Sequence, residues 1–217
     1  MNHDIAIDGP AGAGKSTIAK RIAKKLGYIY VDTGAMYRAL GLYLLRNGIA
    51  ADDTEAIVRA SDEADITLSF ENGEQIVLLN GENVNGLIRT EEVGNMASAC
   101  SVHATVREKM VRRQQEMAKT RDVVMDGRDI CSVVLPDAAV KVFLTASVEV
   151  RAKRRFDELT AKGVTCDLSA IEADIRERDH RDMTRDVTPL KQAPDATLVD
   201  SSDMSIDEVV DAIIGLR

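Results

Sequence analysis

The 217-residue sequence contains no tryptophan, and aromatic residues make up only 3% of it. A core without large rings has to be built from aliphatic side chains and methionine. These are plentiful, because hydrophobic residues account for 45% of the chain. This share predicts a globular protein rather than a disordered one, and the length suffices for one domain with small inserted lobes.

Cysteine is scarce, and long apolar runs are absent. The three cysteines, Cys100, Cys131 and Cys166, are widely spaced and form neither a CxxC pair nor a Cys/His cluster with metal-ligand spacing. Reduced thiols in a cytoplasmic protein are the simplest interpretation. No run approaches 18 uninterrupted apolar residues, and the first ten residues do not have the character of a signal peptide. We therefore expect no membrane partner.

Positive charge is also in short supply. The 28 lysines and arginines are outnumbered by 36 aspartates and glutamates, so the formal net charge is −8. Proteins that bind nucleic acid usually carry a basic face, and this composition argues against such a partner. It leaves room for a local basic pocket that would hold a small anion.

Short apolar runs recur along the chain and alternate with segments of helical character. This alternation is typical of a parallel sheet that is covered by helices on both faces. The runs that we interpret as strands are Ile5–Ile7, Ile29–Val31, Val123–Met125, Val140–Leu144 and Thr197–Val199.

One region departs from this alternation. Ile66–Phe70 and Gln75–Leu79 flank Glu71–Glu74, which is typical of a hairpin turn, and Asn80–Gly81 is a second turn signal. The pattern predicts an antiparallel patch in a small lobe inserted at about residues 60–100.

The most informative segment is Gly9–Ser16, GPAGAGKS, which lies between the first apolar run and a predicted helix at Thr17–Leu26. Strand, G-x-x-x-x-G-K-S and helix form the context of a phosphate-binding loop, which disfavours the alternative of a chance glycine-rich turn. The glycines let successive N–H groups face inward, and the positive end of the helix favours a polyphosphate. Lys15 can reach the outer phosphates, and Ser16 can supply a hydroxyl to Mg²⁺.

Two further motifs follow predicted strands. In Asp32–Arg38, DTGAMYR, either Asp32 or Thr33 can cap a helix, and Arg38 can grip a second phosphate; an ordinary capped helix is the alternative. In Asp126–Asp129, DGRD, the first carboxylate stands where a group that organises Mg²⁺ is expected, although Asp-Gly is also a common turn pair. Ligands bind at the carboxyl edge of such a sheet, which favours the functional interpretation.

In Glu177–Arg185, ERDHRDMTR, charged residues recur at the spacing that apolar residues usually have on the buried face of a helix. On a helix, Arg178, Arg181, Asp182 and Arg185 fall at i, i+3, i+4 and i+7. The stripe is either a solvated face with an i,i+4 pair such as Arg178–Asp182, or a face turned toward a polyanion. A second basic cluster follows a predicted strand: Arg151, Arg154 and Arg155. Phosphoryl transfer between two nucleotides would explain this concentration of arginine in an acidic protein.

Taken together, these motifs resemble those of nucleoside monophosphate kinases, and specifically of the bacterial cytidylate kinase family. The resemblance extends over nearly the whole chain and rests on IDGPAGAGKS, VDTGAMYR, VREKMVRRQ, DGRDI and RERDHRDMTRDVTPL. It implies an α/β fold with a five-stranded parallel sheet core, helices on both faces, an inserted antiparallel hairpin lobe and a helical lid. It implies one domain, residues 1–217, with a core of residues 1–33, 101–150 and 186–217, a monophosphate-binding lobe at 34–100, and a lid with flanking helices at 151–185.

The resemblance also implies roles for individual residues. The ATP-binding set is Gly9, Pro10, Ala11, Gly12, Ala13, Gly14, Lys15, Ser16, Thr17 and the lid arginines Arg154 and Arg155. The set that contacts the monophosphate is Thr33, Tyr37, Arg38 and Arg128, with Arg178 as a phosphate contact near the transfer point. The cytosine pocket is Ser98, Arg107, Asp129 and Arg185, and Asp182 binds the ribose. Lys15, Arg128 and Arg178 would be catalytic, and Ser16 would bind Mg²⁺ together with Asp126, which would act through water.

The activity that the resemblance implies is Mg²⁺-dependent transfer of a phosphoryl group from ATP to CMP or dCMP by a monomer. One departure from the family pattern is that Cys131 and Ser132 stand where Gly-Thr usually follows DGRDI, which puts the backbone of that loop in doubt. The alternatives are a kinase of another monophosphate such as UMP or dTMP, and a regulatory GTPase, which should carry an NKxD motif that we do not find. A structural protein with a fortuitous loop is the least favoured alternative.

Overall fold

The computed structural model describes residues 3–71, 74–119 and 121–217. The chain divides into two compact units. The first contains residues 1–28 and 124–217, and the second contains residues 29–123, so the second is inserted into the sequence of the first. The boundaries expected for a core, a monophosphate-binding lobe and a lid stay a prediction.

A five-stranded sheet carries the phosphate-binding loop, and the predicted parallel sheet with helices is confirmed. The strand pairs β1–β6, β1–β7 and β7–β8 are all parallel. All residues of β1 are buried, as a central strand covered on both faces requires. The strand order is β2 (Ile29–Asp32), β6 (Val123–Gly127), β1 (Ile5–Asp8), β7 (Val140–Thr145) and β8 (Thr197–Asp200).

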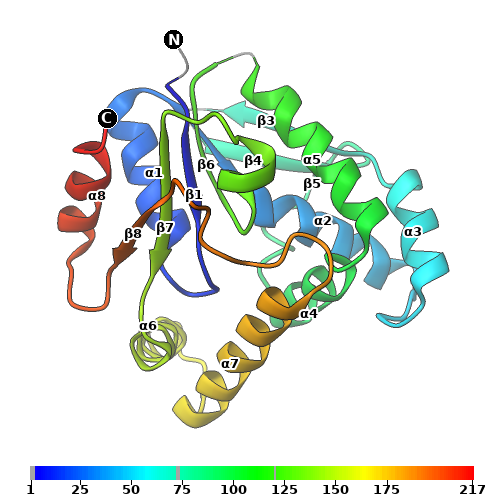
Figure 1. Ribbon diagram of the computed structural model, residues 1–217. Helices are drawn as coiled ribbons and strands as arrows, with labels where there is room; N and C mark the ends of the chain where they lie inside the picture. Colours follow the sequence, from blue (N-terminus) through cyan, green and yellow to red (C-terminus); the bar gives the residue numbers. More distant parts are fainter. Residues whose placement is uncertain (1–2, 72–73, 120) are drawn as a thin grey trace. The chain divides into compact units, whose positions relative to one another are not determined.

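The helices of the first unit begin at polar caps or at the phosphate-binding loop. They are α1 (Lys15–Leu26), η1 (Ile130–Val134, a π-helix), α6 (Val148–Ala161), α7 (Leu168–Thr184) and α8 (Ile206–Ile214). The Ser147 hydroxyl accepts a hydrogen bond from the N–H of Val150 at 3.2 Å, which caps α6. Helices α6 and α7 pack against each other (Figure 1). None of the helices in the described ranges is long and apolar enough to cross a membrane.

The second unit combines helices with a small antiparallel sheet. Besides β2, its elements are α2 (Thr33–Arg46), α3 (Thr54–Glu63), β3 (Ile66–Glu71), β4 (Glu74–Leu79), β5 (Glu82–Asn83), α4 (Glu91–Cys100) and α5 (Ala104–Ala118). The predicted antiparallel patch is confirmed, with Phe70 opposite Gln75. The predicted turn at Glu71–Glu74 includes residues 72 and 73, which lie outside the described residues. Asn80 and Gly81 have φ angles of 51° and 82°, typical of a tight turn between β4 and β5.

Helices α2 and α4 approach each other closely at Gly41. A Cβ atom at Gly41 would lie 3.0 Å from the backbone nitrogen of Ala97 and 3.0 Å from the backbone oxygen of Val93, both on α4. Backbone atoms in a helix cannot move aside as the end of a side chain can. The glycine therefore sets the spacing of the two helices.

We expect Gly41→Ala to lower the free energy of unfolding by about 1–3 kcal/mol because the helices must separate. This loss should outweigh the gain of about 1 kcal/mol from the better helix propensity of alanine. Urea unfolding would measure the difference. The matched control is Gly94→Ala on α4, where the atoms nearest to the new Cβ belong to the Arg38 guanidinium, at 3.0 Å, which is the end of a side chain and not a helix backbone. Equal stability of the Gly41→Ala variant and the wild type would contradict the close packing of α2 and α4.

Candidate active site

The phosphate-binding loop connects β1 to the amino end of α1. Gly9, Gly12 and Gly14 have φ angles of 151°, 77° and 87°, which residues other than glycine rarely adopt. At Gly9 a Cβ atom would lie 1.9 Å from the backbone oxygen of Leu144, so that position admits only glycine. Because Gly14 has no side chain, the first N–H groups of α1 are left for a ligand. Such a helix end attracts an anionic group.

Lys15 is buried beneath this loop. Its Nζ donates a hydrogen bond to the backbone oxygen of Pro10 at 2.7 Å. Burial, and then repulsion by the charge of Arg128, lower its pKa to about 7, although Asp126 and Asp182 oppose the shift. An amine in this state gains its full charge when an anion arrives, so Lys15 is poised to meet a phosphate.

Ser16 and Asp126 bring two oxygen donors together beside the loop. The Ser16 hydroxyl, in the first turn of α1, donates a hydrogen bond to Oδ2 of Asp126 at 3.1 Å. Asp126 is buried near the end of β6. Oxygen donors of this kind are what Mg²⁺ prefers, usually one or two carboxylates with waters and substrate phosphates. The two residues therefore fit the predicted Mg²⁺ position. Within the described ranges, no group of three His, Cys, Asp or Glu residues is arranged to hold a metal ion.

A cluster of arginines surrounds Asp182 in the last turn of α7. Arg128 Nε donates to Oδ2 of Asp182 at 2.7 Å, and Arg185 Nη1 lies 3.9 Å from Oδ1. Burial alone disfavours the carboxylate, yet Arg128, Arg185 and Arg178 together hold the pKa of Asp182 below its ordinary value. Burial and the neighbouring Arg128 lower the pKa of Arg178. Arg128 bonds this carboxylate, Arg185 lies near it and Arg178 acts on it through its charge, so the cluster carries excess positive charge and can accept a further anion.

The charged stripe predicted on α7 needs a correction. The helix ends at Thr184, and Arg185 follows with an extended backbone, so the i+7 position is not helical. The face that is buried contains Asp179 and Asp182, whereas Arg181 pairs with Glu177 at 2.6 Å at the surface. Asp182 bonds Arg128 from a distant part of the sequence, which helical periodicity cannot predict.

Asp8 and Arg151 are two structural residues whose contacts the sequence motifs did not indicate. The two oxygens of Asp8 accept hydrogen bonds from the N–H groups of Ile130 and Cys131, both at 2.8 Å. Arg151 donates to the backbone oxygen of Ala11, inside the phosphate-binding loop, at 2.9 Å. The signals available in the sequence were an acid directly after the first apolar run and an arginine in the basic cluster that follows a predicted strand.

Cys131 stands where the family usually has glycine, and its backbone does not adopt a positive φ angle. The positive-φ residues other than glycine, within the described ranges, are Asn80 and Thr188. The thiol is buried, 3.5 Å from the backbone oxygen of Ala6 and 3.6 Å from that of Val142. Burial raises the pKa of the Cys131 thiol, and it raises that of Cys100 to about 12. Both thiols are free and predominantly protonated at neutral pH.

Of the two predicted lid arginines on α6, Arg154 contacts a residue 47 positions away and Arg155 contacts its own helix. Arg154 Nη2 donates to the backbone oxygen of Ser201 at 2.7 Å, and its Nη1 lies 3.3 Å from the hydroxyl of the same residue. Arg155 pairs with Glu158 at 2.9 Å. Both are more exposed than Arg151, which is nearly fully buried. Their assignment to ATP stays a prediction.

In the second unit, Asp32 positions the start of α2. Its Oδ1 accepts a hydrogen bond from the N–H of Ala35 at 2.9 Å, so Asp32 is the cap and Thr33 is the first helical residue. Its Oδ2 pairs with Arg89 at 2.7 Å. One turn into the helix, Arg38 donates from Nη1 to the backbone oxygens of Ile88 and Thr90 at 3.0 and 3.2 Å.

Two of the residues predicted for the substrate contact each other in this unit. The Arg107 guanidinium lies 5.6 Å from the centre of the Tyr37 ring, within the range of a cation–π interaction. Arg107 is buried and donates to the backbone oxygen of Ser101 at 3.0 Å. The Ser101 hydroxyl in turn donates to the backbone oxygen of Ser98 at 2.9 Å. Arg107 is thus in contact with Tyr37 and is linked to Ser98 through Ser101.

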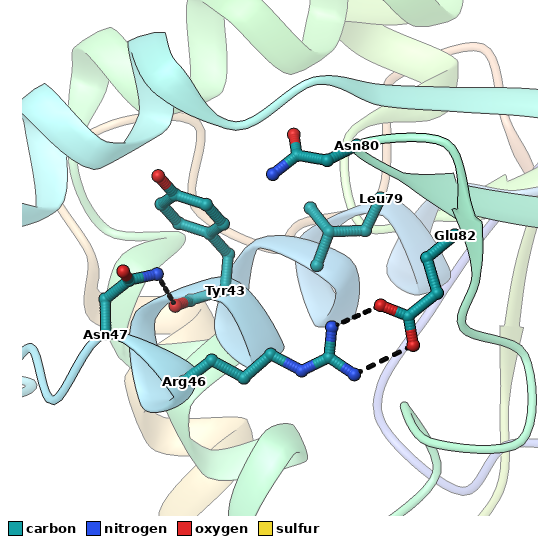
Figure 2. A pocket seen from close by; sticks show the side chains of 6 residues that line it. All are labelled: Tyr43, Arg46, Asn47, Leu79, Asn80 and Glu82. Carbon is teal, nitrogen blue, oxygen red and sulfur yellow. Dashed lines mark hydrogen bonds and ion pairs between the residues drawn. The ribbon is translucent and has the colours of Figure 1, made fainter.

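A pocket of about 410 Å³ on the second unit is separate from these residues (Figure 2). Its lining consists of Tyr43, Arg46, Asn47, Leu79, Asn80 and Glu82. Arg46 is held there by two hydrogen bonds from Nη1 and Nη2 to the carboxylate of Glu82, at 2.6 and 3.0 Å. Its charge is compensated, and none of the predicted substrate residues lines the pocket. We therefore do not place a nucleotide in it.

Comparison with known proteins places these features in a family. The cytidylate kinase family model matches residues 5–216. A cytidylate kinase of Caldicellulosiruptor saccharolyticus is 51% identical over 98% of this chain and 94% of its own length. A cytidylate kinase of Geobacillus sp. (strain WCH70) is 52% identical over 98% of this chain and 95% of its own. The crystal structure of an uncharacterized protein from Eubacterium ventriosum shares the fold, with a TM-score of 0.51 and 14% identity over 99% of this chain and 97% of that one.

Proposed function

Because this chain belongs to the cytidylate kinase family, we propose that it transfers the γ-phosphoryl group of ATP to CMP or dCMP. The products are ADP and CDP or dCDP. The observation that carries the proposal is the Arg128–Asp182 pair at 2.7 Å, whose charges also act on the pKa of Lys15 in the phosphate-binding loop. A loop for a triphosphate and a cluster for a second anion are what a two-nucleotide kinase needs.

On the donor side, ATP is bound by the loop and by lid residues. The N–H groups of the loop and of the first turn of α1 contact the phosphates, and Lys15 reaches the outer ones. The full set is Gly9, Pro10, Ala11, Gly12, Ala13, Gly14, Lys15, Ser16, Thr17, Arg154 and Arg155. The Ser16 hydroxyl and, through water, Asp126 would hold Mg²⁺, which would supply positive charge to neutralise the phosphates.

On the acceptor side, the residues divide by the part of CMP that they contact. Thr33, Tyr37, Arg38 and Arg128 bind the monophosphate. Asp182 binds the sugar, and it can serve CMP or dCMP because both carry a 3′-hydroxyl. The family resemblance assigns Ser98, Arg107, Asp129 and Arg185 to the recognition of cytosine.

The pocket residues match the hydrogen-bonding edge of cytosine. Cytosine presents an exocyclic amine, which suits the carboxylate of Asp129 and the hydroxyl of Ser98, and ring acceptors, which suit Arg107 or Arg185. Uracil presents a carbonyl where cytosine has the amine, so two acceptors would face each other. A buried mismatch of this kind costs about 1–3 kcal/mol, or roughly 10–100-fold in discrimination.

The chemistry requires no covalent intermediate on the protein. An oxygen of the CMP phosphate attacks the γ-phosphorus in line, a new P–O bond forms, and the bond from the γ-phosphorus to the β–γ bridging oxygen breaks. Lys15, Arg128 and Arg178 neutralise the charge that develops on the transferred group and on the leaving ADP. Catalysis is positioning and electrostatic stabilisation.

A panel of monophosphates in a coupled assay with the purified protein tests the substrate. CMP and dCMP should be turned over faster than UMP, dTMP or AMP. In the Asp129→Ala variant the preference for CMP over UMP should shrink by roughly 10–100-fold, because the mismatch with uracil is removed. Turnover of UMP or AMP in the absence of CMP turnover would reject the base assignment. An unchanged CMP preference in the Asp129→Ala variant would reject the role of Asp129.

The proposed enzyme acts as a monomer in the cytoplasm. Support for the location comes from its three free thiols, which suit a reducing compartment. Sedimentation of the purified protein at several concentrations tests the monomer, since a mass that rises with concentration would contradict it.

A further inference from the structure

Arg151 binds the phosphate-binding loop from the side of helix α6. The residue is 4% exposed, and its guanidinium donates three hydrogen bonds. Nη1 donates to the backbone oxygen of Ala11 at 2.9 Å, and Nε donates to that of Ala146 at 2.9 Å. The stem of Arg151 also packs under the loop, since a Cβ atom at Gly12 would lie 3.4 Å from the Arg151 Cβ. Arg151 thus fixes the loop at Ala11 and Gly12 to the start of α6.

The third hydrogen bond of Arg151 reaches helix α7. Nη2 donates to Oδ2 of Asp179 at 2.6 Å, and both side chains are buried. Asp179 adjoins Arg178 in sequence and precedes Asp182 by one turn. One side chain therefore connects the loop proposed for ATP to the turn of α7 that carries two residues proposed for CMP.

A contribution to stability does not by itself explain why Arg151 and Asp179 form a buried ion pair. Buried ion pairs recover little more than the free energy that their desolvation costs, and apolar residues of similar volume are often as stable or more stable. The other oxygen of Asp179, Oδ1, is buried and has no hydrogen-bond partner among the described residues, which makes the pair poorer still. A guanidinium does hold its partners in a fixed arrangement, because its N–H donors point in different directions within one plane.

We propose that Arg151 is a positioning residue for phosphoryl transfer, which sets the register between the phosphate-binding loop and helix α7 through Ala11 and Asp179. The proposal rests on the proposed function. In-line transfer requires the attacking oxygen and the γ-phosphorus at the correct separation, and a misplacement of about 1 Å can reduce the rate about 100-fold. Binding of each nucleotide alone depends less on this register, because the loop and α7 each keep their own contacts.

The central test is the double variant Arg151→Met with Asp179→Leu, which removes both charges and keeps the buried volume. We expect it to fold with a urea midpoint near that of the wild type, because removal of the buried ion pair offsets the loss of the two hydrogen bonds to the backbone oxygens of Ala11 and Ala146. Its kcat for CMP should fall about 10–100-fold, while the Kd of ATP alone and of CMP alone, measured by calorimetry, should change less than about threefold. Arg151→Lys should give an intermediate kcat, because one ammonium cannot reach three acceptors in a fixed plane.

The matched control joins the same two helices elsewhere. Arg176 on α7 pairs with Glu149 on α6 at 2.9 Å, but both side chains are exposed. We expect Arg176→Met with Glu149→Leu to leave kcat within about twofold of the wild type, because exposed ion pairs contribute little.

Three results would overturn the proposal. A wild-type kcat in the stable Arg151 and Asp179 double variant would show that the pair has no part in transfer. A loss of ATP or CMP affinity as large as the loss of kcat would assign Arg151 to binding. An equal loss of kcat in the control double variant at Arg176 and Glu149 would attribute the loss to the general packing of α6 and α7. If the wild type rejects CMP and accepts another monophosphate, the proposed function fails, and the same comparison of kcat with Kd on that substrate decides on Arg151.

Discussion

Replacing Lys15 by methionine is expected to lower kcat about 1,000-fold while the protein stays folded. The ammonium is the cation of the loop that reaches the outer phosphates, and removal of one such electrostatic group costs 100- to 1,000-fold or more in related sites. Methionine fills a similar volume without the charge. A coupled assay measures kcat, and thermal unfolding serves as the control.

The stability of this variant has a defined pH dependence. In the folded protein burial lowers the pKa of Lys15 from 10.5 to about 7. Between these values the unfolded chain binds more protons, so folding of the wild type becomes more favourable as pH rises from about 7 toward 10.5. The variant lacks this contribution. Relative to the wild type, Lys15→Met should therefore be most stable at pH 7 and below. An identical pH dependence in both proteins would contradict the lowered pKa.

The same lowered pKa predicts proton uptake when ATP binds. At pH 8 the free amine is largely neutral, and the triphosphate favours its charged form, so binding should take up as much as one proton. Calorimetry in two buffers with different ionisation enthalpies measures this uptake. It should be absent in Lys15→Met, and equal binding enthalpies in both buffers for the wild type would refute it.

Asp182→Ala is the second substitution with a large expected effect, because it should lower the stability of the protein and also raise the KM for CMP. It removes the carboxylate that Arg128 and Arg185 share, and the Arg185 side chain is only 3% exposed. Breaking a buried pair by removing one partner costs about 3–5 kcal/mol, and we expect the lower part of that range because Arg128 is partly accessible. The KM for CMP should rise about 10–100-fold, with a smaller change for ATP.

Urea unfolding and steady-state kinetics measure the two effects. The matched control is Glu177→Ala on the same helix, which removes the exposed partner of Arg181 and should cost less than about 1 kcal/mol. Since Arg128 and its neighbours hold the pKa of Asp182 below its ordinary value of 3.8, its contribution should be complete above that pH and lost below it. A variant with wild-type stability and an unchanged KM for CMP would remove Asp182 from the site.

Elements that depend on local patterns were predictable. The five strands follow apolar runs whose ends moved by one or two residues, and the antiparallel patch follows two such runs at β3 and β4. The phosphate-binding loop was also predictable, because glycine spacing and the next helix are properties of neighbouring residues. Gly9 shows what remained hidden, since its closest restraint is the backbone oxygen of Leu144 on another strand.

Partners that are distant in sequence were not predictable. Periodicity placed Asp182 in a stripe with Arg178, whereas its carboxylate bonds Arg128, 54 residues away. From the sequence, either Asp32 or Thr33 could be the N-cap of α2. The backbone angles of the structure identify Asp32 as the cap. The hydrogen bond from the N–H of Cys131 to Asp8, 123 residues away, was likewise not predictable.

The sheet, the phosphate-binding loop and the kinase family could be predicted from the amino-acid sequence, because they follow from short-range order and from motifs of fixed spacing. Three features became evident from the folded structure: Lys15 is buried with a lowered pKa, Arg128 and Arg185 lie against Asp182, and Arg151 connects the loop to α7. Desolvation and charge pairing depend on which groups fold together in space. No local pattern of residues specifies that.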